Sequence, residues 1–170
     1  NADASLARLK PVFRQELRAR VVPGKSDVFV FYSGHGAPNV DTREAFLIPW
    51  DYDPKFTPSP DSAYPLKEFY ADLARLKARS ATVVLDACFS GQSDAGTVVK
   101  DASPVFIEFE NPLAAMPGGV VVTASGPREL ATWYREKQHG LLTYYFILGM
   151  SGEAADHQGR ITATGLESYL

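Results

Sequence analysis

Residues 27–36 read DVFVFYSGHG, a run of β-branched and aromatic side chains that stops at Gly34-His35-Gly36. Such a run is long enough for a central strand and too short for a helix, and the glycines end it. Residues 81–91, ATVVLDACFSG, repeat this arrangement, with a second buried strand over 81–86. The pattern predicts two core strands, with His35 just past the carboxyl end of one and Cys88 just past that of the other.

Amphipathic helices are predicted around these strands. Leu6, Leu9, Phe13 and Leu17 recur at steps of three and four residues, which predicts a helix that ends at Pro23-Gly24. Similar patterns predict helices over 66–76, 141–150 (expected to be buried) and 164–170, and strands over 105–109 and 119–125. A short apolar piece at 45–48 leads into a proline-rich surface loop at 49–60.

Predicted strands and helices alternate along the chain, as they do around a mostly parallel sheet that helices cover on both faces. Ligands of such sheets bind beyond the carboxyl ends of the strands. The separation between His35 and Cys88 is long enough for one strand, a crossover and the next strand. We therefore expect a single α/β domain over residues 1–170, with both side chains at one edge of its sheet.

Composition and charge narrow the classes of function. The chain is 45% hydrophobic and 22% charged, as in a globular domain, and its 17 Lys and Arg against 20 Asp and Glu do not favour nucleic-acid binding. No stretch reaches the roughly 18 to 20 apolar residues that a membrane span needs, and the amino end does not resemble a signal peptide. We expect a cytoplasmic protein with neither nucleic-acid nor membrane partners.

Cys88 is the chain's single cysteine, so it forms neither an intramolecular disulfide nor a cysteine-based zinc site. A nucleophilic thiol needs a nearby imidazole or helix N-terminus, and backbone amides for the oxyanion that forms on attack. His35 and Cys88, placed at two strand ends, could meet these needs. The alternative is that Cys88 is an inert core residue and His35 satisfies a turn.

The motifs SGHG (33–36) and DACFSG (86–91), taken together, resemble the His and Cys motifs of the caspase and metacaspase superfamily of clan CD cysteine peptidases. Residues 32–37, 47–51, 85–91 and 139–145 resemble bacterial caspase-like domains, so the resemblance covers nearly the whole chain. It implies a caspase-like three-layer sandwich and peptide hydrolysis through an acyl-enzyme on Cys88. It also implies that His35 acts as acid and base, and that the amides of Gly36 and Cys88 hold the oxyanion.

The resemblance also bears on substrate specificity. Asp86 stands where metacaspases carry an aspartate that lines the S1 pocket and pairs with a P1 Arg or Lys. Residues 130–134 resemble the caspase strand beside S1 and S2, which implies that Thr132 and Trp133 bind substrate. Two alternatives remain: Asp86 serves as a cap or strand-end hydrogen bonder, or Arg128 and Arg135 bind an acidic P1 residue, as in an Asp-specific caspase.

Caspase-like domains normally begin with a core strand and helix before the helix that is predicted here to end at Pro23-Gly24. The resemblance therefore implies that the N-terminal strand and helix are missing and that this segment is a partner on a separate chain. Lys100, in the loop after Cys88, is the candidate for self-cleavage. A further alternative is a catalytically inactive caspase-like scaffold or interaction module.

Some metacaspases depend on calcium, which draws attention to the acidic residues around the proline-rich loop: Glu44, Asp51, Asp53 and Asp61. Such carboxylates are more typical of a solvated surface. Residues 154–167 resemble a decayed calcium loop that keeps Asp156 and Gly159 and lacks most of the other ligands. We expect no metal site and no cofactor, with a protein or peptide as the substrate.

Overall fold

The computed structural model of the protein describes residues 3–89, 92–93, 96–97, 111–113, 115–124 and 132–170. Its helical elements are α1 (Leu6–Pro11), η1 (Val12–Glu16), α2 (Leu17–Arg20), α3 (Leu66–Ala74), η2 (Arg135–Lys137), α4 (Leu141–Leu148), η3 (Gly149–Glu153) and α5 (Ala163–Tyr169). Its strands are β1 (Asp27–Ser33), β2 (Gly36–Asn39), β3 (Glu44–Leu47), β4 (Tyr64–Pro65), β5 (Ser80–Asp86), β6 (Gln92–Ser93), β7 (Gly96–Thr97), β8 (Gly119–Thr123), β9 (Trp133–Tyr134) and β10 (His139–Gly140).

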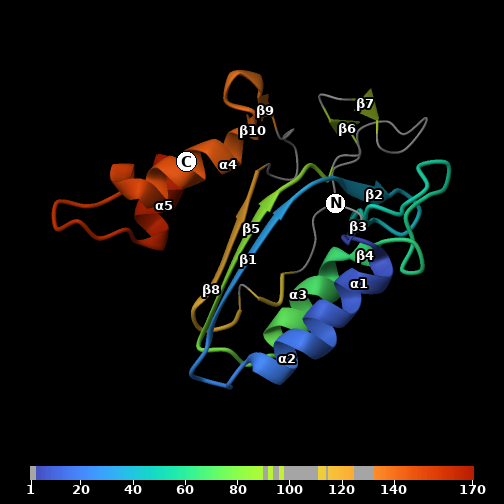
Figure 1. Cartoon of the computed structure of the whole chain (residues 1–170), viewed down its shortest axis with the longest axis horizontal. Coiled ribbons are helices and arrows are strands. Elements are labelled where there is room, and N and C mark those ends of the chain that lie inside the picture. Colours follow the sequence, from blue (N-terminus) through green and yellow to red (C-terminus); the bar gives the residue numbers. More distant parts are fainter. Residues whose placement is uncertain (1–2, 90–91, 94–95, 98–110, 114, 125–131) are drawn as a thin grey trace.

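A parallel sheet with the order β1-β5-β8 lies at the centre of the molecule (Figure 1). β1 and β5 are paired from Asp27 opposite Ser80 to Ser33 opposite Asp86, so the two strands end at the same level. β8 pairs along the other side of β5. The two core strands predicted from their β-branched and aromatic runs are therefore adjacent, and their carboxyl ends lie side by side.

Helices cover both faces of this sheet, as the alternating pattern predicts. On one face the segment α1-η1-α2 and α3 pack against the strands, and the ring of Phe13 meets that of Phe69 edge to face at 5.0 Å. On the other face Val84 of β5 packs with Phe146 of α4 and Leu166 of α5. The structure is thus the expected three-layer α/β sandwich.

The expectation of a buried helix over 141–150 is wrong. Phe146 is buried, but Ile147 is 49% exposed and Met150 is 50% exposed. The helix carries apolar side chains on all of its sides, but only one side contacts the small core around Val84. Because apolar residues do not alternate with polar ones at a helical period here, the sequence does not reveal which side of the helix packs against the sheet.

A second, antiparallel sheet with the order β2-β3-β4 follows His35 directly. β2 has the sequence GAPN, whose composition does not suggest a strand, and it was not predicted. It pairs with β3 from Gly36 opposite Leu47 to Asn39 opposite Glu44. The proline-rich stretch that follows contains no helix or strand from residue 48 to 63, as predicted. The strand predicted over 105–109 lies outside the described residues.

β1 lies at an edge of the central sheet in the described part of the chain. Phe29 and Phe31 on this strand are exposed. The additional N-terminal strand expected beside β1 stays a prediction. None of the helices in the described residues combines the length and apolar composition that a membrane span requires.

A buried carboxylate ties the first helical segment to α3. Asp72 is 6% exposed and accepts hydrogen bonds from the Tyr64 hydroxyl (2.6 Å), Arg14 Nε (2.7 Å) and Arg75 Nη1 (2.5 Å). Burial alone would raise the pKa of Asp72. The hydrogen bonds from Arg14 and Tyr64 and the charges of Arg14 and Arg75 outweigh burial, and the pKa falls below its ordinary value of 3.8.

We expect Asp72→Ala to lower the free energy of unfolding by about 1–3 kcal/mol, because the buried Tyr64 hydroxyl would lose its acceptor. The exposed guanidinium groups contribute less, since solvent screens them. Urea denaturation measures this difference, with Asp61→Ala, at an exposed aspartate, as the matched control.

The difference in unfolding free energy between wild type and Asp72→Ala should depend on pH. Because the pKa of Asp72 is lowered by folding, its stabilising contribution is complete above the unfolded pKa and is lost as the pH falls through the folded value. The gap between wild type and Asp72→Ala should therefore narrow as the pH falls below about 4. A gap that stays constant through acid unfolding would contradict this assignment.

Candidate active site

The ends of β1 and β5 place both sequence motifs at one edge of the sheet. Ser33 and Asp86 form the last pair of the ladder, and the Gly34 N–H donates to the Asp86 carbonyl at 3.2 Å. His35 and Cys88 each follow this pair by two residues. The structure thus brings residues 33–36 and 86–89, with His35 and Cys88, to the same edge, as their spacing predicted.

Gly36 is in direct contact with the segment that carries Cys88. A Cβ atom placed on Gly36 would lie 2.6 Å from the Cys88 carbonyl oxygen and 2.5 Å from the ring of Phe89. Real Cβ atoms do not approach other atoms so closely, so this position requires glycine. The residue after His35 is therefore packed against the backbone of Cys88.

Tyr32 fixes the backbone on which His35 stands. Its hydroxyl donates to the carbonyls of His35 (2.8 Å) and Ile48 (3.0 Å), and the Ile48 N–H donates to the His35 carbonyl at 2.9 Å. Burial raises the pKa of Tyr32, so this hydroxyl remains a donor at neutral pH. The His35 side chain itself is exposed. Sequence reasoning missed Tyr32, although a hydroxyl just before the glycines of an apolar strand was a usable signal.

The pairing of β2 with β3 directs the Gly36 amide. Paired residues of an antiparallel ladder alternate between hydrogen-bonded and non-hydrogen-bonded pairs. Since the Ile48 N–H bonds the His35 carbonyl, the next pair, Gly36 with Leu47, is of the second kind. The Gly36 N–H therefore points away from β3.

Cys88 is buried, with 8% of its surface exposed, and it follows directly on the buried end of β5. An imidazole and a thiol on adjoining segments are the groups that acid-base and nucleophilic catalysis combine. This edge can therefore supply a nucleophile, a proton carrier and backbone donors.

Asp86, the third predicted site residue, caps a helix. Its side chain is 8% exposed and accepts from the Thr143 N–H at 3.3 Å and from the Thr143 hydroxyl, near the N-terminus of α4. A carboxylate is favoured there by the exposed amides and the helix dipole. The capping alternative for Asp86 is thus observed, and Thr143 is a residue that the sequence did not single out. Among the described residues, Asp86 forms no ion pair with Lys or Arg.

The predicted substrate-binding residues Thr132 and Trp133 are linked to Asp86 through Gly140, which pairs with Trp133 and lies against the Asp86 carboxylate. β9 and β10 are antiparallel, with Trp133 opposite Gly140, and the Leu141 N–H donates to the Thr132 carbonyl at 2.8 Å. A Cβ atom on Gly140 would lie 2.0 Å from Asp86 Oδ2. Trp133, which is 49% exposed, and the Asp86 carboxylate are therefore both neighbours of Gly140.

The remaining predicted residues either fall outside the described part of the chain or have contacts of their own. Lys100 and Arg128 fall outside the described residues, and Arg135 is an exposed residue of η2. Asp51 accepts from the Leu6 N–H and Asp53 from the Lys55 N–H, so both have local structural contacts. In the parts of the chain that are described, no three His, Cys, Asp or Glu side chains are grouped as a metal site would require.

A family model described as the caspase domain matches residues 13–162, a stretch that includes His35, Asp86 and Cys88. No curated protein matches the chain.

We expect Gly36→Ala to lower the free energy of unfolding by about 1–3 kcal/mol, because the added methyl group would overlap the Cys88 carbonyl and the Phe89 ring. Urea denaturation tests this, with Ser33→Ala as the control at an exposed position of the same motif. A Gly36→Ala variant as stable as wild type would contradict the close contact between Gly36 and the Cys88 segment.

Proposed function

Because the chain belongs to the caspase-domain family of cysteine peptidases, we propose that it is a cysteine endopeptidase with Cys88 as nucleophile and His35 as acid and base. The observation that supports this proposal most strongly is the contact of Gly36 with Cys88 and Phe89, which holds the two motifs together. Family membership supports the reaction class, and this contact supports the choice of His35 and Cys88 as the acting residues.

In the proposed reaction the Cys88 thiol gives its proton to His35, and the resulting thiolate sulfur attacks the carbonyl carbon of the scissile peptide bond. His35 gives a proton to the leaving amine, and the C–N bond breaks to leave a thioester on Cys88. His35 then takes a proton from water, which attacks the thioester and releases the acid product. The exposed His35 ring on a backbone anchored by Tyr32 fits this role.

The amides of Gly36 and Cys88 are the proposed donors to the oxyanion. The Gly36 N–H is directed away from β3, and Gly36 lies against Cys88. Backbone donors that need no rearrangement stabilise the developing negative charge most effectively. The glycine that the packing requires is therefore also suited to the chemistry.

We propose that the enzyme cleaves after Arg or Lys. Asp86 is a buried carboxylate that is held by Thr143 and has no cationic partner among the described residues. A P1 guanidinium or ammonium group would pair with this charge, whereas an acidic P1 side chain would be repelled. Trp133 and Thr132, near Gly140, would line the neighbouring part of the substrate site.

The proposed reaction needs no cofactor, since the thiol and the imidazole supply the nucleophile and the proton transfers. Its partners would be protein or peptide substrates and a separate N-terminal segment paired with β1, which lies at an edge of the central sheet in the described part of the chain. We place self-cleavage at Lys100, which would satisfy the same basic P1 preference.

Cys88→Ala and His35→Ala should each reduce hydrolysis of a fluorogenic P1-arginyl peptide at least about a thousandfold, because neither group can act without the other. The rate of alkylation of Cys88 by iodoacetamide should also fall in His35→Ala. His157→Ala, at an exposed histidine of the C-terminal segment, is the matched control. Full activity in Cys88→Ala would exclude Cys88 as the nucleophile. No activity in the wild type, together with slow alkylation, would favour the inactive-scaffold alternative.

Replacing Asp86 by Asn should reduce kcat/KM for P1-arginyl peptides about tenfold or more, because it removes the charge while keeping an acceptor for Thr143. Wild type should prefer P1 Arg or Lys to P1 Asp. Thermal unfolding of the variant separates this effect from loss of the helix cap. A preference for P1 Asp would overturn the assignment and favour an Asp-specific caspase.

A further inference from the structure

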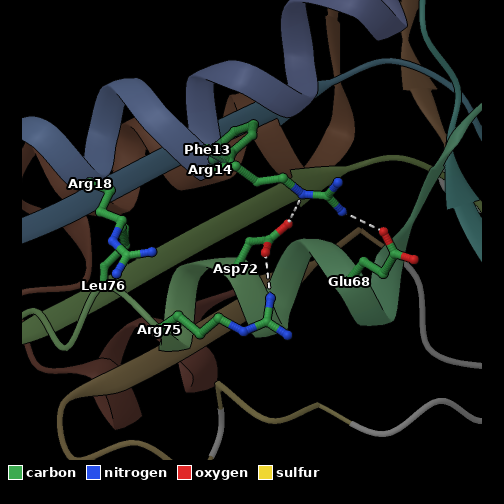
Figure 2. A pocket seen from close by; sticks show the side chains of 7 residues that line it. All are labelled: Phe13, Arg14, Arg18, Glu68, Asp72, Arg75 and Leu76. Carbon is green, nitrogen blue, oxygen red and sulfur yellow. Dashed lines mark hydrogen bonds and ion pairs between the residues drawn. The ribbon is translucent and has the colours of Figure 1, made fainter.

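A groove separates the first helical segment from α3, and its lining residues belong to neither motif of the candidate active site (Figure 2). Its volume is about 500 Å³, within the range of ligand-binding sites. The lining residues are Phe13, Arg14, Arg18, Glu68, Asp72, Arg75 and Leu76.

The charges in this groove do not balance. Three guanidinium groups face two carboxylates: Arg14 pairs with Asp72 and Glu68, and Arg75 pairs with Asp72. Asp72 also accepts from Tyr64, so it already has three donors. Arg18 makes no hydrogen bond or ion pair with the described residues. One positive charge is therefore left over, on Arg18.

The arrangement leaves donors directed at the open groove. Figure 2 shows Arg18 extending from its helix toward Leu76, whereas the Arg75 guanidinium points along α3 toward Asp72. Arg75 uses Nη1 for Asp72, and all five N–H groups of Arg18 remain to bind a ligand. Phe13 and Leu76 give the same groove an apolar lining.

We propose that this groove binds an acidic peptide segment, with a carboxylate at Arg18 and an apolar neighbour against Phe13 and Leu76. Arginine forks match the two oxygens of a carboxylate. Glu68 and Asp72 lie in the same groove, so they would repel a dense anion such as a phosphate monoester more than a singly charged carboxylate. The proposal is independent of the peptidase activity, because it concerns binding alone.

Fluorescence anisotropy with a short labelled peptide that contains Leu-Glu-Glu-Leu tests the proposal. The wild-type chain should bind it more tightly than the matched Leu-Gln-Gln-Leu peptide, and added salt should weaken binding. Arg18→Gln should weaken binding about tenfold. Arg20→Gln, at an exposed arginine of the same helix that does not line the groove, should leave binding unchanged. Circular dichroism should show equal unfolding of both variants.

Three results would overturn the proposal. The first is equal binding of the Glu and Gln peptides, or no binding of either. The second is an equal loss in Arg18→Gln and Arg20→Gln, which would indicate general surface attraction. The third is that inorganic phosphate displaces the peptide at concentrations where acetate at equal ionic strength does not, which would assign the groove to phosphate groups.

Discussion

The close approach of Gly36 to the Cys88 carbonyl is the constraint on which the candidate site depends. The ladder between β1 and β5 brings two strand ends to one level, but it does not decide where the chain goes afterwards. β2 turns away into its own sheet, and only a residue without a side chain can pass Cys88 and Phe89 at this distance. Strand register and one missing Cβ atom thus bring an imidazole and a thiol to adjoining segments.

Asp86 links the fold to the proposed specificity. Burying a carboxylate is costly, and the N-terminus of α4 offsets that cost through Thr143 and the helix dipole. The same contacts hold the charge beside Gly140, whose lack of a side chain leaves room for it. A helix cap and a binding group for a basic side chain need the same property, a charge fixed in a dry position. The two interpretations of Asp86 are therefore compatible.

The local sequence pattern was sufficient to predict strands formed by one continuous run of apolar residues. The runs at 27–33 and 80–86 became strands because β-branched side chains there are bounded by glycine or a turn. β2 was missed because its Gly, Pro and Asn oppose strand formation, and tertiary pairing with β3 overrides them. The contacts of Tyr32 and Thr143 join residues far apart in sequence, so no local pattern contains them. The family match confirms the resemblance carried by the two motifs, whereas the roles of their residues stay predictions.

The most direct test of the central claim is a chemical cross-link across the proposed cleft. 1,3-Dibromoacetone alkylates a thiol and then a nucleophile within about 5 Å of it, a span of three carbon atoms. The account predicts that peptide mapping by mass spectrometry finds Cys88 joined to His35, in a native but not in a urea-unfolded sample. A singly alkylated Cys88, or a link from Cys88 to His139 in place of His35, would contradict it.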